Sequence, residues 1–73
     1  DSYYLVDLIG CEVFEENKLK VGVVHDVLNL PANEVLVVKK ENKEYLIPLI
    51  DDVVKFIDIN NKIIKIVILP GLL

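Results

Sequence analysis

The sequence predicts an all-β fold: a small six-stranded β-barrel with a short helical turn near residues 50–54. Three observations indicate this. Short runs rich in Val, Ile and Leu recur along the chain, polar or turn-forming segments separate them, and 53% of the 73 residues are hydrophobic. A chain this short forms one domain and buries only about 60% of its unfolded surface, so it needs a high hydrophobic content to build a core.

A β-hairpin near the middle of the chain is the element around which the others are arranged. Residues 35–38 and 45–47 are apolar runs, and the polar segment 41–44 joins them. Two β-rich runs separated by a short polar segment indicate a hairpin. Pro48 ends the second run, because proline has no N–H to donate to a sheet. The first run is apolar at every position, so we expect both of its faces to be covered.

Two strands are predicted before this hairpin, over residues 8–14 and 19–30. In the first, Ile9, Cys11 and Val13 share one face, because side chains alternate along a strand. In the second, the apolar positions change face just after Gly22, which predicts a bulge or a sharp bend there. A long, bent strand that serves both halves of a sheet is typical of small closed barrels.

Two more strands are predicted after the hairpin, over residues 55–59 and 62–69. Asn60 and Asn61 form a tight two-residue turn between them, because Asn tolerates positive φ. The last strand has isoleucine at the alternate positions 64, 66 and 68. Its opposite face is also apolar apart from Lys65. We expect that face to be covered, and pairing of two copies through this strand is an open alternative.

Catalytic and metal chemistry have weak support in the sequence. His25 and Asp26 are adjacent, so on a strand they point to opposite faces. Cys11 lies on an apolar face with no basic neighbour in sequence, which favours a buried structural thiol over a nucleophile. One His and scattered carboxylates lack the spacing of metal ligands. We therefore expect neither an enzyme, nor a cofactor, nor a metal site.

The cellular setting and the division of the chain follow from simple features. A single cysteine indicates a reducing, cytoplasmic location, and no apolar run reaches the roughly 20 residues of a membrane span. The net charge of −4 argues against strong direct binding of nucleic acid.

We expect residues 1–7 to be a lead-in from a further domain, residues 8–69 to be the barrel, and residues 70–73 to be a C-terminal tail. The absence of an initiator methionine agrees with a domain of a longer protein or with a trimmed terminus.

The chain resembles the C-terminal PRC-barrel domain of the RimM family of bacterial ribosome maturation factors. The resemblance covers essentially all 73 residues and depends on phrases that occur in one order, namely Tyr3-Tyr4, 7–10, 32–38, 46–48, 50–54, Ile57-Asp58 and 70–73. Two positions differ: the family often has Asp where this chain has Glu34, and an aromatic residue where it has Leu49. Both differences weaken the transfer of individual contacts.

The resemblance implies a non-catalytic assembly factor. Such a domain follows an N-terminal barrel of the same chain, absent here. It binds the 30S subunit or its precursor, contacts a small-subunit ribosomal protein of the head, the one numbered nineteen, and assists 16S rRNA processing. An acidic domain with apolar strips also suits a basic protein partner. The alternative is a stand-alone PRC-barrel protein of sporulating bacteria that acts as an interaction module.

Six residues are the candidates for partner contacts, because they lie in the lead-in and at two corners of the predicted barrel: Tyr3, Tyr4, Asn33, Pro48, Asp51 and Asp52. The tyrosine pair could instead pack locally. Asn33 and Pro48 could serve only their turns. The two aspartates could act as paired carboxylates, but a domain this small offers no deep cleft. One of them capping the turn, with the other facing water, is the favoured structural reading.

Overall fold

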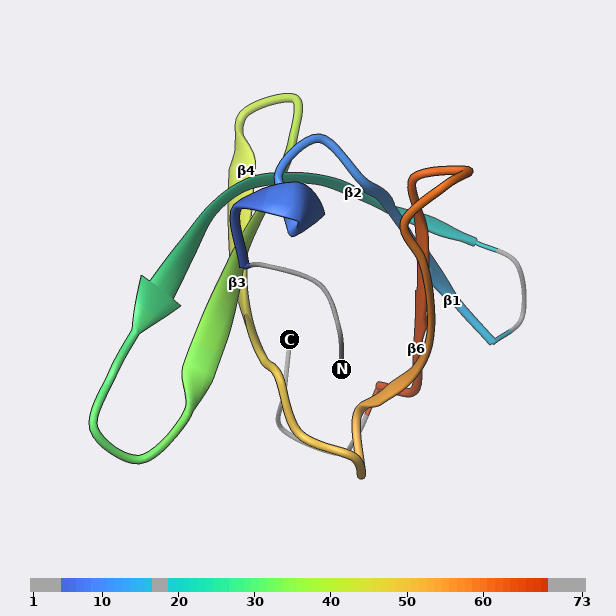
Figure 1. Ribbon diagram of the computed structural model, residues 1–73. Coiled ribbons are helices and arrows are strands. Elements are labelled where there is room, and N and C mark those ends of the chain that lie inside the picture. The colour runs from blue at the N-terminus through green and yellow to red at the C-terminus, as the bar shows by residue number, and fades with distance from the viewer. Residues whose placement is uncertain (1–4, 17–18, 69–73) are drawn as a thin grey trace.

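Six strands and one short 3₁₀ helix form the fold in the computed structural model (Figure 1), which describes residues 5–16 and 19–68. The predicted all-β architecture is confirmed. The elements are η1 (Leu5–Leu8), β1 (Glu12–Glu15), β2 (Lys20–Asn29), β3 (Glu34–Lys40), β4 (Lys43–Pro48), β5 (Val54–Asp58) and β6 (Ile63–Ile66).

The strands form a single curled sheet in the order β4-β3-β2-β1-β6-β5. In Figure 1, β2 arches across the top and carries β3 and β4 on one side and β1 and β6 on the other. Neighbouring strands are antiparallel except β1 and β6, which run parallel with Val13 opposite Ile64. This parallel pair joins the beginning of the barrel to its last strand.

The interior of the curl holds one hydrophobic core to which every strand contributes. Its fully enclosed side chains include Val13 from β1, Val24 from β2, Leu36 and Val38 from β3, Ile47 from β4, and Ile64 and Ile66 from β6. Ile57 from β5 packs against this cluster. The predicted inward face of the last strand is therefore confirmed, and the alternation along each strand separates the core from the outer surface.

The start of the barrel differs from the prediction. The first strand begins at Glu12 instead of residue 8, because residues 5–8 form the 3₁₀ helix η1. Leu8 at its end is fully buried, and Gly10 turns the chain with a φ of 92°. Cys11 is buried as expected, but Ile9 is 38% exposed because the turn, and not strand alternation, sets its direction.

Strand β2 bends at two bulges that lie on either side of Gly22, and not directly after it as predicted. Against β1, Val13 pairs with Gly22 and Phe14 with Lys20, so Val21 is the extra residue. Against β3, the extra residue is His25. Bulges increase the local twist of a strand. Because of the two bulges, β2 bends enough to pair with β1 along one edge and with β3 along the other.

Both predicted hairpins form, with different loops. The β3–β4 turn contains only Glu41 and Asn42, with Glu41 at a φ of 57°. The β5–β6 loop spans four residues, 59–62, where two were predicted, and the positive φ falls on Lys62. The carboxylate of Asp58 accepts hydrogen bonds from the backbone N of Asn61 at 3.2 Å and from its Nδ2 at 2.8 Å. These bonds favour the wider loop, since an Asp side chain can replace a backbone acceptor in a turn.

Gly22 is where β2 and β3 approach most closely. A Cβ at this position would lie 2.5 Å from the carbonyl oxygen of Lys39 and 2.8 Å from Cγ1 of Val38. Both atoms belong to the neighbouring strand, so neither can move without disturbing the sheet. Close backbone approach is a recurrent reason for glycine inside a strand.

We expect Gly22→Ala to lower the free energy of unfolding by about 1 to 3 kcal/mol, because the added methyl group overpacks the contact with β3. Urea denaturation monitored by circular dichroism measures this. His25→Ala, at the exposed bulge, is the control and should change stability by less than about 0.5 kcal/mol. If Gly22→Ala were as stable as the wild type, β3 would have moved to accommodate the methyl group without cost, and the prediction would be wrong.

The Asp58 loop should make a pH-dependent contribution to stability. Hydrogen bonds lower the pKa of the Asp58 carboxyl group below its ordinary value. The largest effect comes from the bond donated by the Asn61 side chain, and the next from the bond donated by the Asn61 backbone N–H. A lowered pKa in the folded state means that the contribution is present above the pKa of the unfolded chain. It is lost as the pH falls through the folded-state pKa.

Asp58→Ala should therefore destabilise the protein at neutral pH, and its difference from the wild type should disappear in strong acid. Denaturation curves at neutral and strongly acidic pH give both differences. Asp52→Ala removes an exposed carboxylate that has no hydrogen bond among the described residues. It should leave stability nearly unchanged at neutral pH.

Candidate partner-binding site

The outer face of strands β2, β3 and β4 carries a set of apolar side chains that do not belong to the core. The strand register aligns them in two rows, Leu28–Val35–Pro48 and Asp26–Val37–Leu46. The core cluster contains none of these residues. We call the apolar members, Leu28, Val35, Val37, Leu46 and Pro48, the outer strip.

The outer strip is only partly shielded from water. Leu46 is 54% exposed and Val37 only 5%, while Leu28, Val35 and Pro48 are half-buried. The prediction that both faces of the β3 strand are covered thus holds for Val37 but not for Val35. Clustered exposed apolar residues framed by polar ones are typical of interaction sites.

One end of the outer strip is held together by the backbone carbonyl of Glu34. This oxygen accepts a hydrogen bond from Nδ2 of Asn33 at 2.8 Å and another from the backbone N of Leu49 at 2.9 Å. The structure therefore brings together two of the candidates, Asn33 and Pro48, which are distant in sequence. The side-chain amide of Asn33 is used inside the turn, as the structural alternative proposed.

Asp51 and Asp52 follow directly, in a single helical turn that confirms the expected turn near residues 50–54. The backbone N atoms of Val53 and Val54 both donate to the carbonyl oxygen of Ile50, at 3.0 and 2.8 Å. Both aspartates are exposed. Neither carboxylate has a hydrogen bond among the described residues, so the expected capping role is wrong.

Three acidic residues lie next to this end of the outer strip along the chain, Glu34 at the start of β3 and Asp51 and Asp52 just after β4, and we call them the acidic corner. Within residues 5–16 and 19–68, no lysine makes an ion pair with a carboxylate of the acidic corner. A region of one charge sign beside an apolar surface attracts a partner of the opposite sign and then buries apolar area against it.

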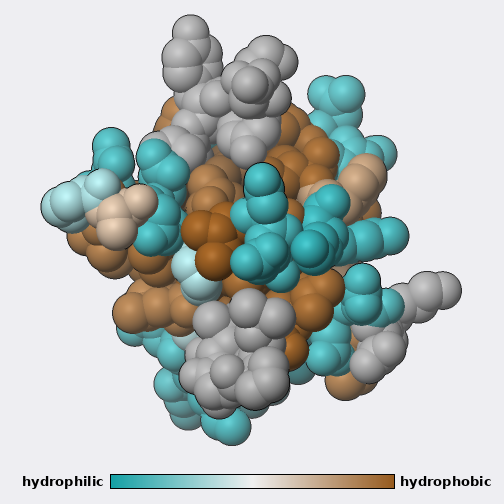
Figure 2. Space-filling model, turned by 90° about the horizontal axis from the view of Figure 1, so that it is seen from below, coloured by the Kyte–Doolittle hydropathy of each residue, from teal (hydrophilic) through white to brown (hydrophobic). Residues whose placement is uncertain are grey.

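Hydrophobic and hydrophilic side chains alternate across the surface in patches, as the space-filling view of the molecule from below shows (Figure 2).

The remaining two candidates, Tyr3 and Tyr4, lie outside the described residues. Glu34 and Leu46 were not predicted as site residues. Glu34 resembles any strand-end residue in the sequence, and the exposure of Leu46 becomes evident only from the strand register.

The residues considered for catalysis occupy positions that serve the fold. His25 is the exposed extra residue of a bulge, and the Asp26 carboxylate accepts a hydrogen bond from the backbone N of Val27 at 2.8 Å. The Cys11 thiol is fully enclosed, and burial is the main cause that raises its pKa. Among the described residues, no three His, Cys, Asp or Glu side chains lie close enough together to hold a metal ion.

Comparisons with known proteins identify the family of this chain. The model of the RimM PRC barrel domain family matches residues 5–72. The ribosome maturation factor RimM of Staphylococcus epidermidis is 54% identical over 72 residues, and that of Clostridium botulinum is 46% identical over 70 residues. The chain belongs to the RimM family.

The resemblance to RimM extends to its solved structure. The RimM of Pseudomonas aeruginosa, described as a 16S ribosomal RNA processing protein, superposes with a TM-score of 0.85 at 29% identity over 92% of this chain. The chain covers 42% of the S. epidermidis RimM, 41% of the C. botulinum RimM and 44% of the P. aeruginosa chain. It therefore corresponds to the PRC-barrel part of a RimM, and the longer relatives contain further sequence.

A search of the described helices finds none that is long and apolar enough to cross a membrane.

The buried thiol gives a testable expectation. A thiol-specific reagent should modify Cys11 of the native protein only when the domain opens, because burial restricts access and disfavours the reactive thiolate. The rate of modification should rise steeply with urea, in parallel with unfolding measured by circular dichroism. Fast modification in the absence of urea, as in a short cysteine peptide, would contradict an enclosed position.

Proposed function

We propose that this chain is the partner-binding domain of a ribosome maturation factor that binds the 30S subunit or its precursor in the cytoplasm and assists 16S rRNA processing without catalysing a reaction. Its direct partner is a basic small-subunit ribosomal protein of the head. The single observation that supports this most is the acidic corner at the end of the outer strip. The N-terminal barrel of the same chain would act beside it, as the lengths of the RimM relatives suggest.

The chemistry of the site fits a basic protein better than a nucleic acid. The three carboxylates of the acidic corner would repel phosphates, whereas they attract lysine and arginine side chains. The outer strip supplies apolar area that a phosphate backbone cannot cover. Among the sequence candidates, Asp51, Asp52 and Pro48 fit this role, and Asn33 supports the corner through the Glu34 carbonyl. Tyr3 and Tyr4 remain proposed contacts.

Relatives identified as RimM at 54% and 46% identity favour this function over that of a stand-alone PRC-barrel protein of sporulating bacteria. The two functions differ in what the acidic corner would meet. If the chain has the proposed function, a ribosomal protein binds at this site. Binding of the isolated head protein therefore distinguishes a ribosome maturation factor from a stand-alone PRC-barrel protein.

We expect the isotope-labelled domain, titrated with the isolated head protein, to show NMR shift changes clustered at Glu34, Leu46 and residues 48–52. The double variant Asp51→Asn/Asp52→Asn should weaken binding by about 0.5 to 2 kcal/mol in total, with the loss shrinking at high salt. Leu46→Asn should weaken binding at every salt concentration, because it removes apolar contact area instead of charge.

The matched control is Glu41→Gln/Glu44→Gln, which removes the same charge from exposed positions at the opposite end of the β3–β4 hairpin. It should leave the affinity close to that of the unmodified domain. If both double variants weakened binding equally, only net charge would matter and the acidic corner would not be the site. Shift changes confined to β5 and β6 would also contradict the proposal.

A further inference from the structure

Strands β1, β6 and β5 carry a second outer surface, on the other half of the curled sheet. In the register of these strands, Lys65 of β6 pairs with Phe14 of β1 on one side and with Phe56 of β5 on the other. The Lys65 ammonium lies 5.5 Å from the centre of the Phe56 ring. Phe56 is 48% exposed, although an aromatic ring of this size usually finds cover within the domain. A cation therefore lies in a row between two aromatic side chains.

The β5–β6 hairpin of this surface is locally basic in an acidic chain. The β5–β6 hairpin, residues 54–66, contains three lysines and one aspartate, whereas the whole chain has a net charge of −4. The aspartate, Asp58, is engaged by Asn61, and Nζ of Lys62 donates to the carbonyl oxygen of Asp7 at 3.2 Å. Lys55 and Lys65 are both exposed and have no carboxylate partner among the described residues.

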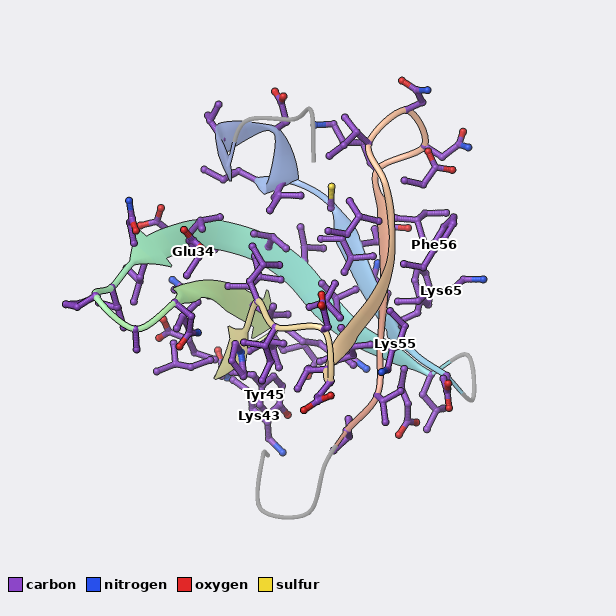
Figure 3. The ribbon with its side chains drawn as sticks, turned by 60° about the horizontal axis from the view of Figure 1, so that its bottom comes forward. Glu34, Lys43, Tyr45, Lys55, Phe56 and Lys65 are labelled. Carbon is purple, nitrogen blue, oxygen red and sulfur yellow. The ribbon has the colours of Figure 1, made fainter. Side chains whose placement is uncertain are left out.

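Lys55, Phe56 and Lys65 lie along the same side of the β5–β6 hairpin, while Glu34 and Lys43 project from other parts of the molecule (Figure 3). Lys55 is the extra residue of a bulge, since Val54 pairs with Ile66 and Phe56 with Lys65. The bulge places Lys55 beside the exposed ring. The three side chains thus form a short platform of one aromatic ring and two cations.

We propose that Lys55, Phe56 and Lys65 form a contact site for single-stranded RNA, with a base against the Phe56 ring and neighbouring phosphates at the two lysines. An exposed aromatic ring beside cations is the combination with which proteins bind single strands of any sequence. The site lies on β5 and β6, whereas the outer strip lies on β2, β3 and β4; Asp52 of the acidic corner is three residues before Lys55 in the chain.

Neighbouring carboxylates set the limits of this site. A shallow groove of about 320 Å³ next to Lys65 is lined by Phe14, Glu15, Glu16 and Ile63. Glu15 and Glu16 would repel phosphates at the β1 end of the groove, and Asp52 and Asp58 would repel them before and at the end of β5, so the RNA contact is confined to Lys55, Phe56 and Lys65. Two lysines and one ring make a weak contact that orients RNA instead of gripping it, consistent with the acidic character of the whole chain.

The test is a fluorescence anisotropy titration of the domain with a labelled unstructured RNA of about ten nucleotides, carried out without any ribosomal protein. Affinity should fall as salt rises from about 50 to about 200 mM, with a slope of about −1.4 in log K against log salt for two phosphate contacts. Phe56→Ala should weaken binding at least about fivefold. Lys55→Gln should reduce the magnitude of the slope by about 0.7, and Glu16→Gln should strengthen binding.

Lys43→Gln, an exposed lysine on the β3–β4 hairpin, is the matched control and should leave both affinity and slope unchanged. Inorganic polyphosphate is the probe without bases, and Phe56→Ala should not alter its binding. Circular dichroism shows whether each variant remains folded. The proposal is overturned if Lys43→Gln and Lys55→Gln have equal effects, if Phe56→Ala leaves RNA binding intact, or if no binding occurs at low salt.

A protein ligand at the same surface is the competing outcome. If the domain bound no RNA but Phe56→Ala weakened its complex with the head protein, the platform would be part of the protein interface. That result would overturn the RNA site and leave the proposed function standing. If the domain bound RNA but did not bind the head protein, the RNA site would stand and the proposed function would be contradicted.

Discussion

The contact between β2 and β3 at Gly22 is the constraint on which the rest of the fold depends. Strand β2 pairs with β1 along one edge and with β3 along the other, so it joins the two halves of the curled sheet. A side chain at Gly22 would meet the backbone of Lys39 at 2.5 Å. Because the strands can approach this closely between two bulges, β2 bends enough for the inward side chains of all six strands to meet in one core.

Alternation along the strands then gives the domain two separate outer surfaces. On β2, β3 and β4, the residues facing away from the core form the outer strip beside the acidic corner. On β1, β6 and β5, the outward residues form two rows, Phe14–Lys65–Phe56 and Glu12–Ile63–Asp58. A sheet that curls around its core exposes these two surfaces on different strands, β2–β4 and β1, β6 and β5.

Much of the fold could be predicted from the sequence because its signals are local. The apolar runs of the central hairpin and the stop at Pro48 identify β3 and β4 directly. The 3₁₀ helix was not predictable, since the apolar residues of 5–9 fit a strand equally well. The bulges were misplaced because Val23 and Val24 give the same signal on either face.

The candidate site was harder to predict, since a surface depends on which strands become neighbours. Asp51 and Asp52 were found as a corner, but Leu46 and Phe56 look like core residues until the register shows that they face outward.

The parallel pairing of β1 with β6 has a consequence for how the protein is made. Within this domain, β1 is the first strand to be translated, whereas its partner β6 at Ile63–Ile66 is the last. Until then, one edge of β1 has no neighbour and the core lacks Ile64 and Ile66. Long-range pairing of this kind slows folding. The domain can therefore complete its fold only after β6 has been translated, and until then the open edge of β1 is available for pairing with other strands.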